Sequence, residues 1–466
     1  MTQLEVGSLL VTHPATHSKQ WKWIISVILT EWLGLTPIFC EHNKNKIELS
    51  DGKKTLALAC QFLIKEEIEA PSQQYLPKLP LQKWSYPDIL AISTGMDTRN
   101  DLPIIFGNSD FRIDSTDNVE MGLDVFGSAF FMLSRYEEII LEKFDSHLRY
   151  AGKTSFSAHA GILNRPLIDE YIEILKKIIG FIWPSLPLSA NAGQKIVSCD
   201  VDEPFERWIR DPAYLAKGIA GALIRRRSLA TAKRRLLNGI LSPLGDYRCD
   251  PYWNFDWYMD ICERHNRKAQ FYFIAQDGPR DVDAAYSVES KRIQGLLKNI
   301  HDRGHLIGLH GSYESFADFK RLAAERERLQ QACERAGANQ EISHSRQHYL
   351  RWNARVTPDC QDFAGIKVDS TLGYADLPGF RCGTCRKFTM WSWKEMASLK
   401  LQQQPLIIME GTLLSGVYMD IRVDAENIFH MLSETSLAHG GDHTILWHNS
   451  NLTTDADRTL FEAVIS

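Results

Sequence analysis

Short apolar runs alternate with longer amphipathic stretches through the second half of the chain. This alternation is typical of a parallel β/α sheet or barrel, in which buried strands read as continuous apolar runs. We predict seven strands, near residues 196–199, 269–274, 305–309, 343–348, 366–368, 406–409 and 444–448. Helices are predicted near residues 256–266, 288–303, 317–336 and 425–438.

The first 190 residues form a different pattern, and we predict a separate α/β domain there. Its expected strands lie at residues 9–11 and 102–107, and its expected helices at residues 21–33, 125–138 and 167–179. Residues 184–193 are rich in Pro, Ser and Gly, which favours a linker. We find no catalytic constellation in this domain, so its role is unknown at this stage.

A basic insertion at residues 207–241 interrupts the second domain. Between Arg207 and Arg235 the chain has nine basic residues, and Asp211 is the only acid. Apolar residues recur at helical spacing, so the insertion is expected to form an amphipathic helix with an anionic partner, either a membrane surface or a phosphorylated substrate. The alternative is a solvated helix that packs on its own domain. Neither interpretation is favoured by the sequence.

Composition limits the class of protein. The chain has 466 residues, of which 44% are hydrophobic and 24% charged, as expected for a globular protein of two or three domains. The net charge of -5 gives no indication of a nucleic-acid partner. Nine scattered cysteines, with Cys382 and Cys385 at the only metal-like spacing, are expected to be reduced thiols. The first residues lack a basic segment, so no secretory signal is expected and the prediction is a cytoplasmic protein.

Two acids follow the first strand of the second domain. Asp200 and Asp202 are two positions apart, so on an extended strand their side chains lie on the same side. One could bind a metal ion while the other takes a proton from water. The alternative is a solvated acidic turn before Pro204, which fits poorly with acids that follow an apolar strand directly.

A second pair of candidate ligands follows the third strand. His310 and Glu314 are four residues apart, the spacing that brings two side chains together on one helical turn. Imidazole and carboxylate together are plausible ligands for a divalent metal. Alternatively, His310 is a hydrogen-bonded histidine and Glu314 an acid at the start of a helix.

Other polar side chains follow the later strands. In parallel barrels, active sites collect at the carboxyl ends of the strands. Core packing does not require polar residues there, so we expect them to meet at one rim. They are Arg346, Asp369, Glu410 and His448.

In this order, these residues resemble the NodB-type polysaccharide deacetylases, over roughly residues 195–455. The matching features are the acidic pair Asp200 and Asp202, the segment from Gly304 to His310, Arg346 to His348, Asp369-Ser370, and Leu446 to His448. Glu314 stands where the family has a second histidine. The strings from Arg346 to Arg351 and from Leu446 to Ser450 resemble a narrower branch, met in surface-polysaccharide gene sets, that has an extra N-terminal domain.

The resemblance implies a distorted (β/α)7 barrel at residues 191–466, preceded by an α/β domain at residues 1–190. It further implies a metal-dependent hydrolase that removes an N-acyl group, mainly acetyl, from a sugar in O-antigen or capsule biosynthesis. Asp202, His310 and Glu314 would hold the metal. Zinc is the expected ion, with manganese, iron, cobalt and nickel as alternatives.

The resemblance also implies roles for the remaining residues. Asp200 would be the base, oriented by Arg346, and His448 the acid, with Asp369 as its partner. The residues expected to contact substrate are His348, Tyr349, Trp352, Arg381 and Trp447.

The expected partners follow from these assignments and from the basic insertion. The substrate would be an N-acylated sugar, phosphorylated or lipid-linked if the insertion binds anions, with peripheral contact at the inner membrane face and no nucleic acid. A different class stays open because Glu314 replaces a histidine: a catalytically degenerate carbohydrate-binding or assembly module on the same fold.

Overall fold

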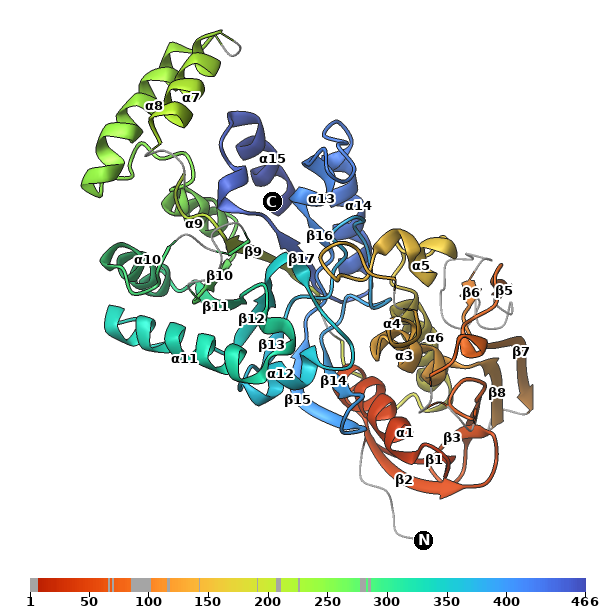
Figure 1. The fold of residues 1–466 in the computed structure, drawn as a ribbon. Helices are drawn as coiled ribbons and strands as arrows, with labels where there is room; N and C mark the ends of the chain where they lie inside the picture. Colours follow the sequence, from red (N-terminus) through yellow and green to blue (C-terminus); the bar gives the residue numbers. More distant parts are fainter. Residues whose placement is uncertain are drawn as a thin grey trace.

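The computed structural model describes residues 7–466 except 66–67, 69–70, 85–101, 115–117, 142, 191, 207–210, 225–226, 277–281 and 284–285. The chain is a mixed α/β protein with two large sheets (Figure 1). Several predicted features lie outside the described residues, namely Arg207, Arg210, Arg225 and Arg226 of the basic insertion. Within the described part, no helix is both long enough and apolar enough to cross a bilayer.

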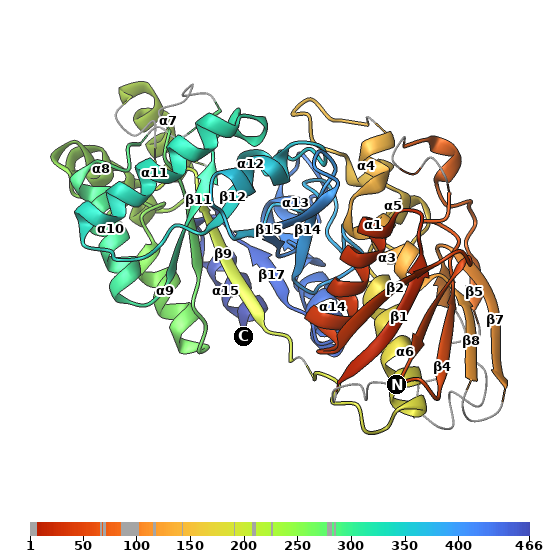
Figure 2. The ribbon, with the colours of Figure 1, turned by 90° about the horizontal axis from the view of Figure 1, so that it is seen from below.

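The N-terminal unit is a six-stranded sheet in the order β2-β1-β3-β4-β8-β7. Its strands are β1 (Ser8–Pro14), β2 (Thr36–His42), β3 (Lys46–Ser50), β4 (Thr55–Ala59), β7 (Gly107–Asp114) and β8 (Asn118–Leu123), with a separate pair β5 (Gln82–Trp84) and β6 (Leu102–Ile104). The helices α1 (Ser18–Ile25), α3 (Val125–Leu133) and α6 (Leu167–Ile182) lie between this sheet and the rest of the molecule (Figure 2).

Two of the predicted N-terminal helices are interrupted. The apolar stretch after α1 continues as a π-helix at Ser26–Trp32. The stretch predicted as one helix over residues 125–138 splits into α3 and α4 (Tyr136–Ile140), because Arg135 adopts a left-handed conformation with φ 55° between them. A short α5 (Phe156–His159) follows.

The second unit is built on a nine-stranded sheet in the order β14-β15-β13-β12-β11-β10-β9-β17-β16. Its strands are β9 (Lys195–Val201), β10 (Gln270–Ile274), β11 (Leu306–Gly311), β12 (His344–Gln347), β13 (Val368–Asp369), β14 (Phe388–Ser392), β15 (Ala397–Gln403), β16 (Ile408–Met409) and β17 (His443–Leu446). Each of the seven predicted strands is present, and β14 and β15 are additional. Among the described strands, β14 and β16 end the sheet without pairing to each other, so closure into a barrel is not confirmed.

Helices follow most of these strands, as the alternating pattern predicts. They are α9 (Phe255–Arg264), α10 (Lys291–Asp302), α11 (Phe319–Ala336), α12 (Thr357–Phe363), α13 (Glu410–Leu414), α14 (Ala425–Ala438) and α15 (Asp455–Ile465). Local sequence sets their ends. Asp318 caps the first turn of α11, and Gly337 ends that helix with φ 77°. All neighbouring strands of the sheet except β14 and β15 pair in parallel, so the carboxyl ends of the parallel strands meet at one edge.

The basic insertion is a helical hairpin, which we call the arm: α7 (Pro212–Ile224) and α8 (Leu229–Leu241). It stands away from the body of the molecule at the upper left of Figure 1. At its base, the buried carboxylate of Glu206 accepts hydrogen bonds from Arg235 (2.9 Å) and from the Tyr214 hydroxyl (3.0 Å). The arm therefore has two helices, not one, and they pack mainly on each other.

A buried ion network joins the two units. Arg381 of the second unit donates two hydrogen bonds to Glu138, of 2.9 and 2.7 Å, and Arg135 pairs with the same carboxylate at 2.9 Å. Burial would raise the pKa of Glu138, but the two arginines lower it. Because Arg381 is held here, it does not line the pocket at the carboxyl ends of the strands. Its expected role in substrate contact is therefore not met.

We expect Glu138→Gln to lower the free energy of unfolding by about 3–5 kcal/mol, because two buried guanidinium groups would lose their counter-ion. The measurement is urea unfolding followed by circular dichroism. Asp302→Asn is the matched control, since it removes an exposed pair with Lys298 (2.8 Å) and should cost about 0.5 kcal/mol. Equal effects of the two changes would mean that the network does not hold the units together.

Candidate active site

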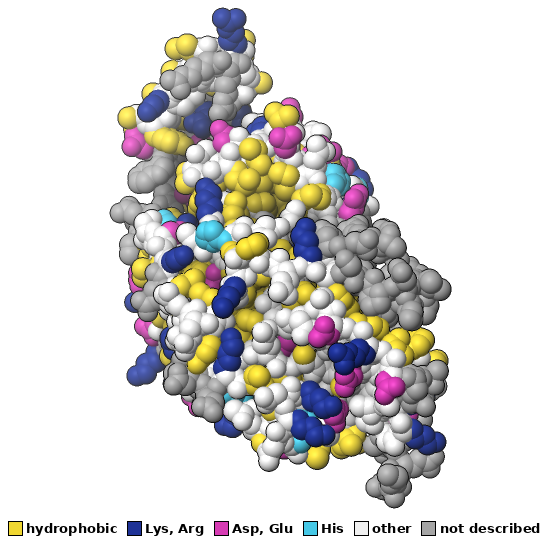
Figure 3. Space-filling model, turned by 90° about the vertical axis from the view of Figure 1, so that its right-hand side faces the viewer, with side chains coloured by type: hydrophobic (Ala, Val, Ile, Leu, Met, Phe, Trp, Pro, Cys, Tyr) yellow, Lys and Arg dark blue, Asp and Glu magenta, His cyan; other side chains and the backbone are white. Residues whose placement is uncertain are grey.

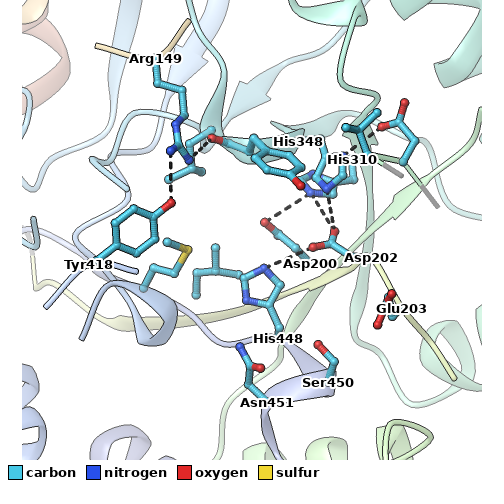
Figure 4. A pocket seen from close by; sticks show the side chains of 16 residues that line it. Arg149, Asp200, Asp202, Glu203, His310, His348, Tyr418, His448, Ser450 and Asn451 are labelled. Atoms are coloured by element: carbon cyan, nitrogen blue, oxygen red, sulfur yellow. Dashed lines mark hydrogen bonds and ion pairs between the residues drawn. The ribbon is translucent and has the colours of Figure 1, made fainter. Parts of the chain in front are cut away.

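A pocket of about 400 Å³ opens at the carboxyl ends of the parallel strands (Figure 4). Strands β9, β11, β12 and β17 bring their terminal or following residues to it. The sixteen lining residues are Arg149, Asp200, Asp202, Glu203, Val282, Asp283, His310, His348, Tyr349, Leu350, Met409, Tyr418, Leu446, His448, Ser450 and Asn451. The structure thus brings Asp200, Asp202, His310, His348 and His448 together, from positions up to 248 residues apart in the chain.

Asp200 and Arg346 form a buried pair beside the pocket. Arg346 Nη1 donates to Asp200 Oδ1 at 2.8 Å, and neither side chain is more than 3% exposed. Arg346 is fixed further by Ser198 Oγ (2.9 Å) and by the Ser370 carbonyl (2.8 Å). Burial lowers the pKa of Arg346, but the Asp200 charge raises it above its ordinary value. The expected contact between these two residues is therefore present, and it orients the Asp200 carboxylate.

Asp202, His310 and His348 form a group that could hold a metal ion, with candidate ligand atoms all within 4.8 Å of one another. His310 Nε2 lies 3.2 Å and His348 Nε2 lies 3.6 Å from Asp202 Oδ1. Figure 4 shows both imidazoles directed at this carboxylate. In the described part of the chain this is the one such group, so Cys382 and Cys385 do not form another.

The hydrogen bonds of the two histidines suit metal binding. His310 Nδ1 donates to the Arg346 carbonyl (2.8 Å), and His348 Nδ1 contacts Asp283 Oδ1 (3.0 Å). With Nδ1 fixed in this way, each Nε2 is left to act as a ligand, as in many metal sites. Asp202 Oδ1 is buried and accepts no hydrogen bond. Two imidazoles and a carboxylate are a common donor set for zinc and related ions.

The site also attracts positive charge. Burial lowers the pKa of His348, but the Asp202 charge outweighs it and raises the pKa to about 9. Burial would raise the pKa of Asp202, but the charges of His348 and His310 outweigh it and hold the pKa well below its ordinary value. The residues present therefore fit a divalent cation.

Glu314, the third ligand expected from the sequence, does not join this group. Its side chain is 58% exposed and faces Arg351 Nη1 at 3.4 Å. The expectation required a helical turn between His310 and Glu314. Strand β11 instead continues to Gly311, and Glu314 follows in a turn, so the four-residue spacing does not bring the two side chains together. His348, expected to contact substrate, takes the third position.

His448 is paired with a residue that the sequence resemblance did not indicate. Its Nδ1 lies 2.6 Å from Glu410 Oε1, and its Nε2 faces Asp202 Oδ2 at 3.6 Å. Burial lowers the pKa of His448, but the Glu410 charge raises it more, to about 10. The imidazole therefore carries a proton near neutral pH, as a general acid requires.

Asp369, the expected partner of His448, lies elsewhere. Its carboxylate accepts hydrogen bonds from Thr371 Oγ1 (2.5 Å) and Gln361 Nε2 (2.6 Å). Burial raises the pKa of Asp369 to about 6. It ends β13, whereas His448 follows β17, and four strands of the sheet, β12, β11, β10 and β9, lie between them. Glu410 follows β16, which pairs with β17, and this adjacency explains the contact with His448.

The aromatic residues expected to contact substrate divide into two kinds. Tyr349 lines the pocket. Trp352 and Trp447 are buried, at 1% and 0% exposure, and Trp447 packs on Phe429 and Phe461. These two indoles are core residues in this structure, so their expected stacking on a sugar is not met.

The sequence did not indicate every pocket residue, and Asp283, Tyr418 and Arg149 are examples. Asp283 supports His348, Tyr418 lies in the segment after α13, and Arg149 comes from the N-terminal unit. None of these three is part of a motif or follows a predicted strand. The apolar side chains Leu350, Met409 and Leu446 also line the pocket, and they belong to a small apolar cluster separate from the main core.

Comparisons with known proteins give one family model and several solved structures. A model of a family of unknown function, DUF7033, matches residues 9–184, less than half of the chain. No curated protein matches the chain. Similar solved structures include one from Mycobacterium smegmatis proposed as a polysaccharide deacetylase (16% identity, 59% of this chain, 84% of that chain, TM-score 0.38).

Two further solved structures are of the same kind. One, from Pseudomonas aeruginosa PAO1, is also proposed as a polysaccharide deacetylase (13% identity, 67% of this chain, 90% of that chain, TM-score 0.36). The other is a family 4 carbohydrate esterase from Streptomyces lividans in complex with acetate (11% identity, 59% of this chain, 88% of that chain, TM-score 0.27). At these TM-scores the likeness assigns no activity, so the proposals below depend on the side chains of the pocket.

Proposed function

We propose that this chain is a metal-dependent hydrolase that removes an N-acyl group, acetyl in the first place, from a sugar unit of a surface polysaccharide. One observation carries the proposal: a carboxylate held by arginine, Asp200, and an imidazole held by carboxylate, His448, both lie beside the group of Asp202, His310 and His348. A base and an acid beside a cation site are the groups that amide hydrolysis requires.

Asp202, His310 and His348 would hold the ion, with zinc as the first expectation. Bound there, it would supply Lewis acidity that polarises the amide carbonyl and lowers the pKa of water. Asp200, oriented by Arg346, takes the proton of the attacking water. His448 starts protonated because of Glu410 and gives its proton to the departing amine of the sugar.

The binding-module alternative depended on the glutamate in place of a second histidine. His348 now supplies that imidazole from another strand, which removes the reason for expecting a degenerate site. The reaction is tested by the release of acetate from UDP-N-acetylglucosamine, lipid-linked N-acetylglucosamine and N,N′-diacetylchitobiose, with protein that is zinc-loaded or treated with a chelator. Zinc-dependent release of acetate from at least one of these compounds supports the proposal. Release from none of them favours a carbohydrate-binding or assembly module.

The arm lies where it could bring the pocket close to a membrane surface. Figure 2 shows α7 on the same side of the sheet as the carboxyl ends of β9 and β11, where the pocket opens. Large apolar side chains near its tip are exposed, Ile224 at 75% and Leu229 at 79%. Figure 3 shows apolar and basic side chains together on the arm at the top of the view. Apolar and basic residues together suit an anionic membrane surface, where a lipid-linked substrate would be presented.

We expect replacement of Arg225, Arg226 and Arg227 by Gln to weaken binding to vesicles containing phosphatidylserine by up to about 100-fold at moderate salt, since each cation near an anionic surface contributes about 1 kcal/mol. Co-sedimentation measures the binding. The matched control replaces the exposed Lys19, Lys44 and Lys53 of the N-terminal unit, with the same change of charge and no expected effect. Unchanged binding by the arginine variant would leave the arm as a structural element.

A further inference from the structure

The N-terminal unit reaches into the pocket through the segment between α4 and α5. This segment, orange in Figure 1, crosses the carboxyl ends of the parallel strands. Its residue Arg149 lines the pocket, with 9% of its side chain exposed. Figure 4 shows Arg149 and Tyr418 on the opposite side of the pocket from His310 and Asp202. We call this side of the pocket the wall. The proposed function assigns no role to it, and the family that matches the N-terminal unit is of unknown function.

Arg149 holds two residues of the second unit in place. Its Nη1 donates to the Tyr349 carbonyl at 3.1 Å, and its Nη2 donates to the Tyr418 hydroxyl at 3.1 Å. The guanidinium also lies 6.0 Å from the centre of the Tyr418 ring. Because the Tyr418 oxygen accepts from Arg149, the hydroxyl hydrogen is directed elsewhere. Among the described residues no acceptor contacts it, so it can be donated to a ligand in the pocket.

The charge of Arg149 is already balanced within its own segment. Arg149 Nε donates to Asp145 Oδ2 at 2.7 Å, and the Asp145 side chain is 30% exposed. Asp145 also accepts from the backbone amide of Arg149 at 3.0 Å, which fixes the turn. The Arg149–Asp145 pair offers hydrogen-bond donors but has little net charge. Such a wall suits neutral acceptors, such as sugar hydroxyls, better than a phosphate, which favours unpaired cations.

We propose that the N-terminal unit forms the far wall of the substrate pocket, where Tyr418, positioned by Arg149, donates a hydrogen bond to a hydroxyl of the N-acylated sugar unit. The wall thereby fixes how the sugar lies relative to Asp202 and His310. The N-terminal unit is then part of the specificity of the site and not a separate module. This inference rests on the proposed function for the class of sugar, and on the described contacts for the wall.

The test is binding of UDP-N-acetylglucosamine and of UDP alone to the full-length protein, measured by isothermal titration calorimetry. Tyr418→Phe removes the hydroxyl and keeps the ring. Arg149→Lys removes the guanidinium group, whose two Nη atoms hold the Tyr349 carbonyl and the Tyr418 hydroxyl. We expect each to weaken binding of UDP-N-acetylglucosamine about tenfold, the loss of one hydrogen bond, and to leave binding of UDP unchanged.

Arg351→Lys is the matched control. Arg351 also bridges the two units, since its Nε donates to the His147 carbonyl at 3.0 Å, but it does not line the pocket. This variant should bind both probes as the wild type does. If it also weakened sugar binding, the effect of Arg149→Lys would reflect loosening of the two units, and the assignment of the wall would fail.

The remaining outcomes separate this inference from the proposed function. If the Tyr418 and Arg149 variants bound UDP as much more weakly as they bound UDP-N-acetylglucosamine, the wall would contact phosphate. If they bound both compounds as the wild type does, the wall would contact no ligand. No binding of UDP-N-acetylglucosamine by the wild type would contradict the assignment of a nucleotide-linked sugar to the wall, while the other two compounds would still test the hydrolase proposal. If binding follows the expected pattern while no acetate is released, the wall is confirmed and the hydrolase proposal fails.

Discussion

His348→Ala is expected to lower zinc affinity by at least about 100-fold, while Glu314→Ala leaves it unchanged. Replacing a residue that only supports a metal ligand typically lowers metal affinity about 10- to 100-fold. Removing a ligand itself should therefore lower the affinity by at least about 100-fold. His348 Nε2 faces the buried and otherwise unsatisfied Asp202 Oδ1, whereas Glu314 is largely exposed beside Arg351. Competition with a chromogenic chelator measures both affinities.

Glu314→Ala serves as the matched control because it removes a carboxylate from the same segment as His310. Asp202→Ala and His310→Ala should behave like His348→Ala, and circular dichroism should show each of them folded. Loss of zinc on Glu314→Ala together with its retention on His348→Ala would restore the ligand set expected from the sequence.

Asp200→Asn is expected to keep the metal and to lower the rate of acetate release by about 10²- to 10⁴-fold, the contribution of a positioned base. Asparagine keeps the size of the side chain but cannot take a proton. The change also leaves Arg346, which is fully buried, without its counter-ion, so the stability of the variant must be measured alongside its rate. Thermal unfolding shows whether the variant is folded at the assay temperature.

His448→Ala is the companion variant, since it removes the proposed acid without leaving a buried arginine unpaired. It should also keep the metal and lose most of the activity. Release of zinc by Asp200→Asn, with retention by Asp202→Asn, would exchange the roles of the two acids.

Seven strands of the second unit could be predicted because each is largely buried and runs parallel to its neighbours. Such strands read as continuous apolar runs, as in β9, whose residues from Ile196 onward are buried. The acids and histidines that end these runs were visible for the same reason. Strands β14 and β15 were missed because β14 follows a segment rich in Gly and Cys, and β15 alternates between more and less exposed positions.

The ligand set could be predicted only in part. Asp202 and His310 each follow an apolar strand directly, and the strand itself fixes their direction. Glu314 was chosen from a spacing that holds on a helix, and the chain there leaves a strand and enters a turn. His348 was assigned to substrate contact because its motif alone does not show which way the side chain points.

Contacts between distant segments could not be predicted from local patterns. The choice between Glu410 and Asp369 as the partner of His448 depends on β16 pairing with β17, which the strand sequences do not specify. Arg149 reaches the pocket only because the N-terminal unit packs beside the second unit through Glu138 and Arg381. Spacing along the chain gives no indication of either contact.

The central claim is that Asp202, His310 and His348 are the ligands of a catalytic metal ion. Anomalous X-ray scattering recorded on either side of the zinc absorption edge, from crystals of the zinc-loaded protein, tests it most directly. The claim predicts one strong peak in bonding contact with Asp202, His310 and His348, and none beside Glu314. A peak beside Glu314, or no peak in this pocket, would contradict it.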